Sequence, residues 1–391
     1  MKVVGIVAEY NPFHNGHKYQ IDYAKNTLNA DYVIVAMSGP FTQRGTIACY
    51  DKYTRSHAAL LNGADIVLEI PVMFATASAR EFSSAAVELL NSTGIVDTIL
   101  FGAENADKEL FLNTANKIIN IEKTQEYQNK IAISMSEGKS FAQARIDATS
   151  DLVDTSLFES SNNILGFEYT KYILENNLNI EIECLKREGN SYNDQELQDS
   201  FSSASAIRNA IFLNTGVAAY IPDNTLELYE NDTFIEDNSV SQLLHYKLLT
   251  NESFVSFLDC NNDISDRINN IKRDYTDFKS FCELLTTKNI SKTRASRILC
   301  HILLDIKTCD FNQQKEKGYI SYLRLLGFSR HGSNALALIK EYGMHPLVTA
   351  PPENVLYHDI LASDIRRVIL TSETTKVYPN EYTRKFTLAN I

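Results

Sequence analysis

The sequence predicts an α/β fold in which a doubly wound parallel sheet is followed by a mainly helical second domain. With 391 residues the chain is too long for one ordinary core, which suggests two domains. Short apolar runs alternate with helical patterns through the first half, and the joints between them are mostly short. Beyond about Thr215 nearly all of the chain has a helical pattern. We therefore expect a sheet domain over residues 1–215 and a mainly helical domain over residues 216–391.

The predicted strands are near-continuous apolar runs, which suit strands covered on both faces. They are Lys2–Tyr10, Asp31–Met37, Ala64–Ile70, Val96–Gly102 and Ile180–Arg187. The helical patterns among them lie at about Gly16–Leu28, Asp51–Asn62, Ala77–Asn91, Lys108–Ile119 and Asn163–Asn176. In a doubly wound sheet, ligands bind at the carboxyl ends of the strands near the switch in strand order, so the site is expected there.

The second half begins with a turn-rich, acidic stretch at Gly216–Thr233. The helices expected beyond it are Ser239–Thr250, Asp266–Asp274, Asp277–Thr286, Ser291–Lys307 and Ser333–Tyr342. The prolines of His345–Val355 interrupt this pattern, and the tail that follows is expected to add a strand or two.

The composition is that of a soluble globular protein, with 44% hydrophobic and 22% charged residues. No uncharged apolar run approaches the length of a membrane span, and Glu9 interrupts the short apolar start of the chain. The six cysteines form no CxxC pair, which indicates reduced thiols rather than disulfides or a zinc site. These features predict a cytoplasmic protein with no membrane partner.

Basic residues are concentrated in one segment of an otherwise acidic chain. The net charge is −12, yet Thr286–Lys340 contains ten basic residues and only three acidic ones. Such asymmetry is the footprint expected of a phosphate-binding surface, whereas the plainer interpretation is a solvated helical face.

The stretch His14-Asn15-Gly16-His17 follows the first predicted strand and opens the first predicted helix. A helix N-terminus is an anion site, because its first backbone N–H groups are unpaired and its dipole is positive there. His14 and His17 are three residues apart, so both imidazoles can donate hydrogen bonds on the same side of that N-terminus. Such donors would stabilise charge that builds on a phosphate during displacement at the α-phosphorus.

This HxGH stretch resembles the signature of the nucleotidyltransferase superfamily, whose members have a Rossmann-like sheet, bind ATP and transfer or activate through AMP. Two other interpretations compete with this resemblance. The two histidines could be zinc ligands, although no third ligand stands at a recognisable spacing, or they could be incidental turn residues.

Further polar residues follow the other predicted strand ends. Arg44 lies after the second strand, where it could pair with a phosphate or a carboxylate, and Gly102 ends the fourth, where an adenine ring could approach the backbone. Asn162 and Asn163 precede a helix, and Arg187 ends the fifth strand. Each position also has an ordinary interpretation as a loop, a turn or a helix cap.

Two helical motifs add basic side chains. Lys52 and Arg55 are three residues apart on a predicted helix and could face either the pocket or solvent. The stretch Phe201–Ile211 resembles the ISSTxxR motif of nucleotidyltransferases, with Ser205 and Arg208 in its first turns, although Ala204 replaces one of the motif's hydroxyl residues. A capped surface helix is the alternative.

Taken in order, EYNPFHNGH, MSGPFTQRG, GADIVLEIP, FGAEN, NNILGFEY, KREG and SSASAIR are similar to the tRNA(Met) cytidine acetate ligase family. The resemblance covers most of the first 210 residues and continues more loosely into Thr293–Leu304. It implies an enzyme that uses ATP to convert acetate to acetyl-adenylate. It also implies transfer of the acetyl group to the N4 amine of the wobble cytidine of elongator tRNA(Met).

The resemblance further implies the site residues. His14 and His17 are expected to be catalytic, and Mg²⁺ is expected to accompany the triphosphate. The expected ATP contacts are Val7, Ala8, Glu9, Tyr10, Asn11, Pro12, Phe13, His14, Asn15, Gly16, His17, Lys18, Tyr19, Gln20, Gly102, Asn162, Arg187 and Arg208. The sequence does not separate Asn162 from its neighbour Asn163.

Two alternatives remain open at this point. One is an adenylyltransferase that joins AMP to a small phosphate substrate, although such enzymes are usually small and would not explain the basic, helical second half. The other is a tRNA-binding module whose nucleotide pocket is not catalytic, an interpretation that intact His14 and His17 weaken.

Overall fold

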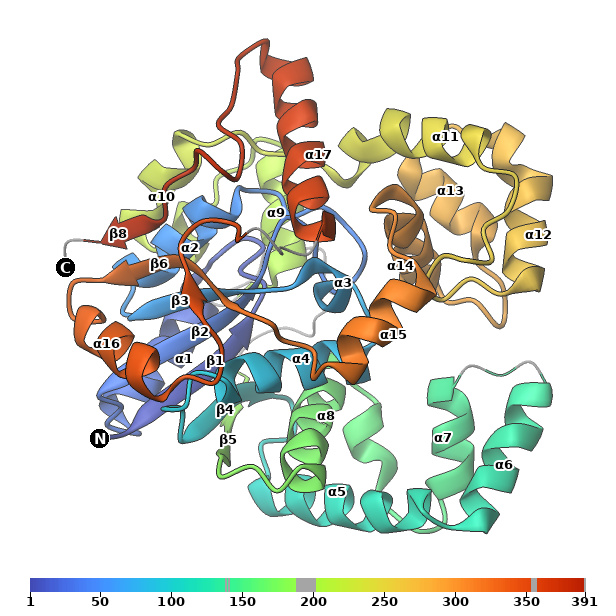
Figure 1. The fold of residues 1–391 in the computed structure, drawn as a ribbon, viewed down its shortest axis with the longest axis horizontal. Coiled ribbons are helices and arrows are strands. Elements are labelled where there is room, and N and C mark those ends of the chain that lie inside the picture. Colours follow the sequence, from blue (N-terminus) through green and yellow to red (C-terminus); the bar gives the residue numbers. More distant parts are fainter. Residues whose placement is uncertain (138, 140, 188–201, 353–356, 390–391) are drawn as a thin grey trace.

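The computed structural model describes all residues of the chain except 138, 140, 188–201, 353–356 and 390–391 (Figure 1). Phe201, the first residue of the predicted phosphate-binding motif, lies outside the described residues. The rest of that motif forms the start of a helix, α9 (Ala204–Phe212), which Ser203 caps by accepting a hydrogen bond from the Ala206 backbone N–H at 3.1 Å.

Five parallel strands form the larger part of one sheet, as the sequence predicts. They are β1 (Val3–Ala8), β2 (Tyr32–Ser38), β3 (Ile66–Ile70), β4 (Thr98–Ala103) and β5 (Glu181–Lys186), paired in the spatial order β5-β4-β1-β2-β3. The chain runs outward from β1 to β3 and then returns to the other side of β1. This switch in strand order lies between β1 and β4, so a crevice is expected at the carboxyl ends of these two strands.

Both faces of the sheet are buried, which explains the near-continuous apolar runs. Along β2, Val33 and Val35 pack with side chains of α1 (Asn15–Asn26) and α2 (Lys52–Leu61), whereas Ile34 packs with α4 (Ala79–Asn91) on the other face. Successive strand residues point to opposite faces, so each face has its own apolar core. α8 (Ser161–Glu175) packs beside α4 on the second face.

The first half also carries a helical extension. Its helices are α5 (Lys108–Glu122), α6 (Gln125–Ser136) and α7 (Phe141–Thr149), and they extend away from the sheet below the second half in the view of Figure 1. The sequence predicts α5 but not α6 or α7. The other helices are α3 (Val72–Ala75), α10 (Asp223–Glu230), α11 (Ser241–Thr250), α12 (Asn262–Ile271), α13 (Phe278–Leu285), α14 (Lys292–Leu303), α15 (Thr308–Glu316), α16 (Ser333–Tyr342) and α17 (Tyr357–Thr374). Among the described residues, no helix combines the length and the apolar character that crossing a bilayer requires.

The second half returns to the sheet, which the sequence does not predict. β6 (Leu323–Ser329) pairs antiparallel with β3, and it carries both β7 (Leu347–Val348) and β8 (Thr387–Ala389). Of these strands, only the one in the tail, β8, was expected. The division of the chain at residue 215 stays a prediction, but these strands place part of the second half within the sheet of the first.

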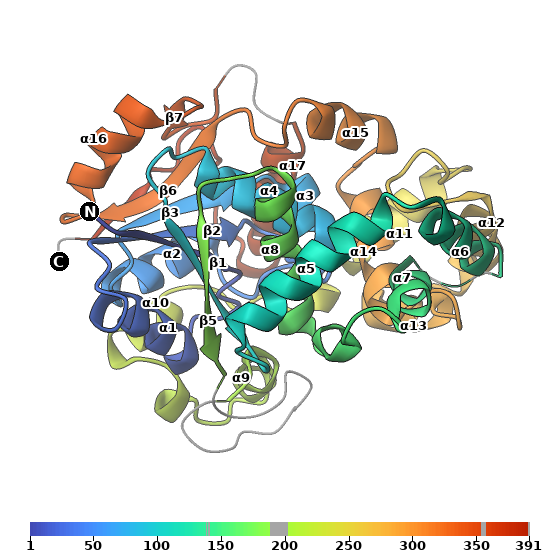
Figure 2. The ribbon, with the colours of Figure 1, turned by 90° about the horizontal axis from the view of Figure 1, so that it is seen from below.

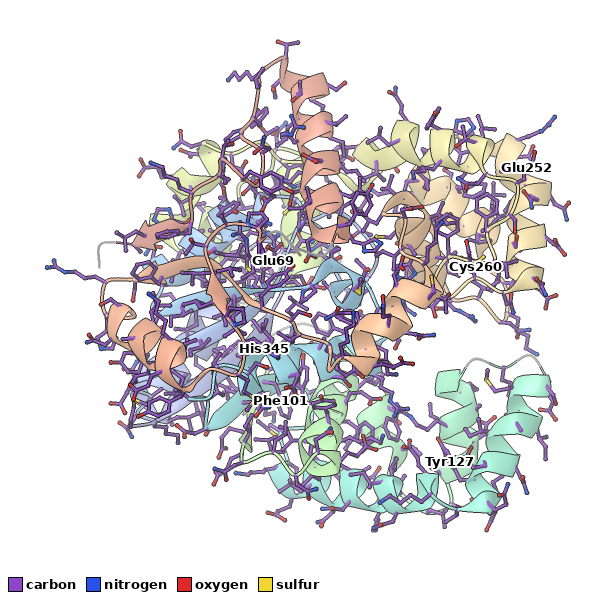
Figure 3. The ribbon with its side chains drawn as sticks, in the orientation of Figure 1. Glu69, Phe101, Tyr127, Glu252, Cys260 and His345 are labelled. Carbon is purple, nitrogen blue, oxygen red and sulfur yellow. The ribbon has the colours of Figure 1, made fainter. Side chains whose placement is uncertain are left out.

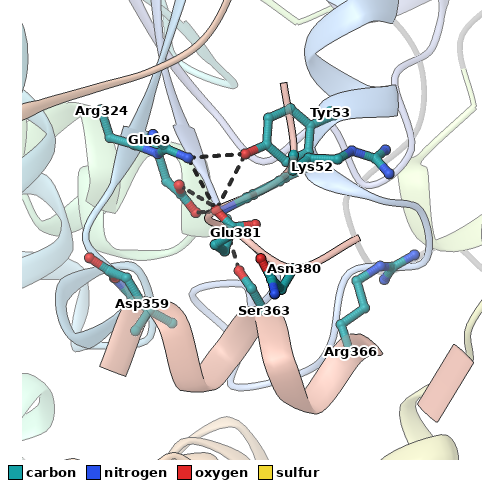
Figure 4. Close-up of polar contacts among 12 residues, drawn as sticks. Lys52, Tyr53, Glu69, Arg324, Asp359, Ser363, Arg366, Asn380 and Glu381 are labelled. Atoms are coloured by element: carbon teal, nitrogen blue, oxygen red, sulfur yellow. Dashed lines mark hydrogen bonds and ion pairs between the residues drawn. The ribbon is translucent and has the colours of Figure 1, made fainter. Parts of the chain in front are cut away.

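A buried cluster of charged side chains ties the C-terminal segment to the sheet (Figure 4). The Lys52 ammonium lies 2.8 Å from each carboxylate oxygen of Glu69 on β3 and 2.9 Å from Glu381 Oε2. Arg324 of β6 and the Tyr53 hydroxyl also contact Glu381. Lys52 is 2% exposed and does not line the pocket at the carboxyl ends of β1 and β4, so we assign it to the link between segments.

The basic residues of Thr286–Lys340 do not form one surface. Arg324 is buried in the charge cluster, and the Arg297 side chain is 14% exposed. Lys340 lies on α16, at the end of the molecule opposite α14, as both Figure 1 and Figure 2 show. The net charge of the segment therefore overstates the positive charge that any single face presents.

Candidate active site

A pocket opens at the carboxyl ends of β1 and β4, where the switch in strand order lies. Twelve of the predicted site residues line it: Val7, Ala8, Glu9, Tyr10, Asn11, His14, His17, Gln20, Gly102, Asn162, Arg187 and Arg208. Arg44 also lines it. Gly16 and Tyr19 line an adjoining hollow that shares His14, His17 and Arg187 with the pocket.

Four predicted residues line neither hollow. Phe13 is fully buried, and Pro12 follows a cis peptide bond beneath the turn. The Asn15 side chain donates to the Ala219 carbonyl at 2.9 Å, and the Lys18 ammonium pairs with Asp22 at 2.6 Å. In the structure these residues support the turn or face away from it, and no ligand contact is assigned to them.

The two histidines cap the first helix with their own rings. His14 Nδ1 accepts a hydrogen bond from the Gly16 backbone N–H at 3.1 Å, and His17 Nδ1 accepts one from the His14 backbone N–H at 3.2 Å. An Nδ1 that accepts cannot carry the proton of a neutral ring, so the proton is on Nε2 in both rings. The rings stack with centroids 3.7 Å apart. The turn therefore offers two neutral Nε2–H donors side by side.

The surroundings keep both imidazoles neutral. Burial and, to a smaller extent, the positive charges of Arg187 and Arg208 together lower the pKa of His14 to about 3. Burial and the neighbouring His14 and Arg187 hold the pKa of His17 well below its usual value, although its ring is partly open toward the pocket. Neutral donors can hydrogen-bond to an anion without a change of protonation between acidic and alkaline conditions.

We expect acidification to destabilise the protein partly through this pair. Both folded-state pKa values lie below the unfolded value, so the unfolded chain binds more protons as the pH falls through about 6.5. Stability is therefore complete above this pH and is lost below it, by roughly 1.4 kcal/mol per pH unit for each histidine. Urea unfolding at pH 5.5 and 7.5 should give a smaller pH difference for His14→Gln/His17→Gln than for the unchanged protein. Equal differences would show that the pair titrates normally.

Residues far apart in the sequence hold the turn in place. The Tyr229 hydroxyl of α10 accepts a hydrogen bond from the Phe13 backbone N–H at 2.7 Å, and the Cys49 backbone N–H donates to Asn11 Oδ1 at 2.8 Å. The fully buried Arg55 donates to the backbone carbonyls of Glu9, Ser38, Gly39 and Tyr50. Arg55 therefore positions the start of the turn from beneath, and it is not a pocket residue.

Two arginines approach the histidines from different elements. Arg208 on α9 donates to the Asn11 carbonyl and, at 3.1 Å, to Ser205 Oγ. Arg187 follows β5, and its backbone N–H donates to the Ala103 carbonyl at 3.0 Å. A Cβ at Gly102 would lie 3.3 Å from the Arg187 side chain, so the glycine gives this arginine room. The two guanidinium groups and the helix N-terminus together form a site for a polyanion.

We expect Arg187→Gln and Arg208→Gln to raise the ATP KM more than they lower kcat. The two arginines bind phosphate groups whose charge is the same in the ground state and the transition state. Their loss therefore weakens the binding of both states equally. Steady-state kinetics with ATP as the varied substrate would measure this, and Lys18→Gln, outside the pocket, is the matched control. An unchanged ATP KM in both variants would show that Arg187 and Arg208 do not bind ATP.

The structure separates the adjacent asparagines. Asn163 is 3% exposed, and its Oδ1 accepts hydrogen bonds from the backbone N–H groups of Glu104 and Asn105, at 3.0 and 3.2 Å. Asn162 lines the pocket, and its Nδ2 donates to Glu104 Oε1 at 2.6 Å. Asn163 therefore holds the loop after β4, and Asn162 is the one available to a ligand.

Seven pocket-lining residues were not predicted: Gln43, Phe82, Phe101, Ser161, Leu165, Tyr169 and Ala204. Figure 3 shows Phe101 on β4, below α4 and beside α8. Gln43, Phe101, Leu165, Tyr169 and Ala204 lie within motifs quoted above, although none of them was named there as a site residue. Phe82, Leu165 and Tyr169 fall on the apolar stripes of α4 and α8, where a pocket residue has the same pattern as a core residue.

The loop that carries Gln43 and Arg44 rests against α14 of the second half. Ser296 Oγ donates to the Gly45 carbonyl at 3.1 Å. Gly45 has φ +73°, and a Cβ there would lie 2.6 Å from the Arg297 backbone, so only glycine permits this contact. α14 thus contacts the loop that carries two pocket residues, through Ser296 and Arg297 in its second turn.

Comparison with known proteins connects this site to one family. The model of the HIGH Nucleotidyl Transferase family matches residues 1–381. Proteins named tRNA(Met) cytidine acetate ligase are similar over most of their length. The one from Thermosipho africanus is 33% identical, covering 98% of this chain and 97% of its own, and the one from Clostridium acetobutylicum is 34% identical, covering 93% and 94%.

Two solved structures of Thermotoga maritima TmcAL also match this fold along their full length. The apo form has a TM-score of 0.92 with 29% sequence identity, and the form bound with alpha-thio ATP has a TM-score of 0.90 with 28% identity. Each comparison covers 100% of both chains.

Proposed function

The chain belongs to the tRNA(Met) cytidine acetate ligase family of HIGH nucleotidyl transferases, and from this premise we propose how its pocket works. It is an ATP-dependent ligase that acts on tRNA(Met). ATP activates acetate as acetyl-adenylate, and the acetyl group then passes to the N4 amine of the wobble cytidine. The observation that carries this proposal is the pair of neutral histidine donors at a helix N-terminus, faced by Arg187 and Arg208.

In the first step an acetate oxygen bonds to the α-phosphorus, and the bond from this phosphorus to the oxygen that bridges it to the β-phosphate breaks. Pyrophosphate leaves with the electron pair. Negative charge builds on the non-bridging oxygens of the α-phosphate, where the Nε2–H groups of His14 and His17 donate. Preorganised donors stabilise such charge without reorganising during the reaction. Arg187 and Arg208 hold the outer phosphates and so align the α-phosphorus with acetate.

Mg²⁺ would arrive with ATP as part of the substrate. Magnesium keeps several waters and binds mainly through phosphate oxygens at such sites. Among the described residues, no group of three or more His, Cys, Asp or Glu side chains is placed to hold a metal ion, so the triphosphate would supply most of the ligands.

The acceptor tRNA would approach over α14, which contacts the loop that carries Gln43 and Arg44. Lys292 is exposed there, and Arg294 is partly exposed. Lys288 is also exposed, just before α14, whereas Arg324 is buried and Lys340 lies at the opposite end of the molecule. The tRNA surface proposed here is therefore smaller than the whole basic segment. The protein would then work in the cytoplasm, where tRNA is modified.

We expect Lys292→Gln/Arg294→Gln to weaken tRNA binding and to reduce its salt dependence. The variant makes fewer phosphate contacts, so its binding releases fewer counterions. The slope of log K against log salt should fall by about 0.7–0.9 per contact. Gel-shift titrations at several salt concentrations would measure it, with Arg330→Gln/Lys340→Gln at the far end of the molecule as the control. If the control pair weakened binding and the α14 pair did not, the tRNA would lie elsewhere.

A direct test is product analysis. The protein is incubated with ATP, ¹³C-labelled acetate and an elongator tRNA(Met) transcript, and the nucleosides are separated by mass spectrometry. We expect labelled acetylcytidine, dependent on both ATP and acetate. AMP joined to a small phosphate substrate, or tRNA binding without any product, would support one of the two alternatives instead.

A further inference from the structure

We propose that the part of the pocket between β1, α4 and α8 binds the target cytosine base and that the Glu9 carboxylate recognises its exocyclic amine. This inference rests on the proposed function. It assigns to base recognition a residue that the sequence places among the ATP contacts.

The pocket has two halves of different chemistry. The half beside α1 and α9 contains His14, His17, Arg187 and Arg208, and it suits phosphates. The other half has an apolar wall made by Phe82, Phe101, Leu165 and Tyr169, with the polar side chains of Glu9 and Gln43 beside it. Single bases drawn out of an RNA are held against apolar and aromatic side chains, with polar groups at their Watson–Crick edge.

Glu9 is held in a fixed position at the end of β1. Its Oε1 accepts a hydrogen bond from the Gln43 backbone N–H at 2.7 Å, and its backbone carbonyl accepts one from Arg55. Gln43 is itself fixed, because its Nε2 donates to the Ala77 carbonyl at 3.1 Å. In the part of the chain that the structure describes, Oε2 has no hydrogen-bond partner, so one acceptor is available to a ligand.

A carboxylate in this place would repel the triphosphate, so it favours a position for the phosphates in the other half of the pocket. It suits an amine. A carboxylate only accepts hydrogen bonds, and the N4 amine of cytosine donates them, whereas uracil has a carbonyl oxygen at the same position. Glu9 would therefore favour cytosine and disfavour uracil.

Tyr169 supplies a hydrogen-bond donor beside the Glu9 acceptor. It is 4% exposed and lines the pocket from α8. Burial raises the pKa of its hydroxyl, and the neighbouring Glu9 raises it further, so the hydroxyl stays protonated and can donate. The ring nitrogen N3 and the carbonyl oxygen O2 of cytosine are acceptors. A carboxylate and a hydroxyl on one wall thus match the donor and acceptor edge of this base.

The same carboxylate can take the proton that the reaction releases. The N4 lone pair attacks the acetyl carbonyl carbon, and a C–N bond forms. The bond from that carbon to the phosphate oxygen breaks, and AMP leaves with the electron pair. The proton lost from N4 passes to Glu9 Oε2 and then to solvent, so atoms and charge balance.

The test compares the two half-reactions in Glu9→Gln. Acetyl-adenylate formation is followed by ATP–pyrophosphate exchange without tRNA, and acetyl transfer by a single turnover with the wobble-cytidine transcript. We expect transfer to fall by about 100-fold or more, the effect of losing a general base, and exchange to fall much less. Glu9→Asp should restore part of the transfer. Tyr169→Phe should slow transfer more than exchange, whereas Tyr172→Phe, one turn along α8 and bonded to Glu88 at 3.1 Å, should affect neither.

Binding gives a second readout. The unchanged protein should bind the wobble-cytidine transcript more tightly than the same transcript with a wobble uridine, by roughly 5- to 100-fold. Glutamine can both donate and accept hydrogen bonds, so Glu9→Gln should reduce the ratio of the affinities for the cytidine and uridine transcripts.

Equal losses of exchange and transfer in Glu9→Gln, or an increased Mg²⁺ requirement for exchange, would overturn the proposal and assign Glu9 to ATP or its metal. An unchanged cytidine preference would also overturn it. Absence of acetate-dependent exchange in the unchanged protein would instead refute the proposed function, and the base site with it.

Discussion

Replacing His14 or His17 with alanine should lower the rate of acetyl-adenylate formation by about 10²- to 10³-fold. Removing one preorganised donor to a developing oxyanion costs about 2.7–4 kcal/mol of transition-state stabilisation. Each ring presents a neutral Nε2–H, since its Nδ1 accepts a backbone hydrogen bond. The rates are measured as acetate-dependent pyrophosphate release at saturating ATP, where kcat and not binding is reported.

His14 also caps α1, so a loss of activity in the alanine variant could come from a disturbed turn. His14→Asn separates the two roles, because asparagine is a good N-cap but has no donor at the position of Nε2. We expect this variant to keep its thermal stability and to lose activity as the alanine variant does. Near-normal pyrophosphate release in the His14 and His17 variants would show that the histidines are not catalytic.

Replacing Lys52 with methionine should lower the free energy of unfolding by about 3–5 kcal/mol. Removing one partner from a buried ion pair leaves an uncompensated charge, and here it leaves both Glu69 and Glu381 without their lysine. Burial by itself lowers the pKa of Lys52, but the carboxylates of Glu69 and Glu381 together raise it above its ordinary value. Equilibrium unfolding in urea at neutral pH would measure the loss.

The matched control for this effect is Lys108→Met. Its ammonium pairs with Glu183 at 3.0 Å, but the Lys108 side chain is 36% exposed, so we expect a change of about 0–1 kcal/mol. Adding Glu69→Gln to Lys52→Met should recover part of the stability, because the second change removes one of the carboxylates left without its partner. A loss below about 1 kcal/mol for Lys52→Met would show that the cluster does not hold the C-terminal segment.

The central sheet was predictable because its strands are buried on both faces and therefore have near-continuous apolar runs. β6 has such a run as well, but it lies within a segment whose other stretches are helical and basic. Its position in the sheet comes from antiparallel pairing with β3, in which Arg324 lies opposite Glu69 of the first half. No local pattern reports a pairing over that distance.

The helices α6 and α7 were missed for a different reason. Of the residues in α6, only Tyr127 and Ser134 are buried, so the apolar repeat that marks a helix is nearly absent. Helix capping by Thr124, which accepts a hydrogen bond from the Tyr127 backbone N–H, was the available signal.

The phosphate half of the pocket was largely predictable because its key residues stand together in one turn. His14 and His17 are neighbours on one helix, and the tight turn before them is visible in the sequence. The base half is assembled from Glu9, Gln43, Phe82 and Tyr169, which lie on four separate elements. Their side chains meet only through the fold, and an aromatic residue at a helical spacing gives no sign of whether it faces the core or a cavity.

The sequence also could not show which of two adjacent asparagines faces the pocket. Asn162 and Asn163 differ only in their rotation about α8, which places one amide in the pocket and the other on the backbone of Glu104. The charge of the basic segment was misleading in a similar way, because net charge does not distinguish exposed Lys292 from buried Arg324.

ATP–pyrophosphate exchange isolates acetyl-adenylate formation, the step assigned to the two histidines and the two arginines. The exchange is measured with acetate present or absent and with tRNA present or absent. We expect exchange that requires acetate, proceeds without tRNA and is lost in His14→Asn. Exchange that proceeds without acetate, or no exchange under any of these conditions, would rule out the acetyl-adenylate mechanism.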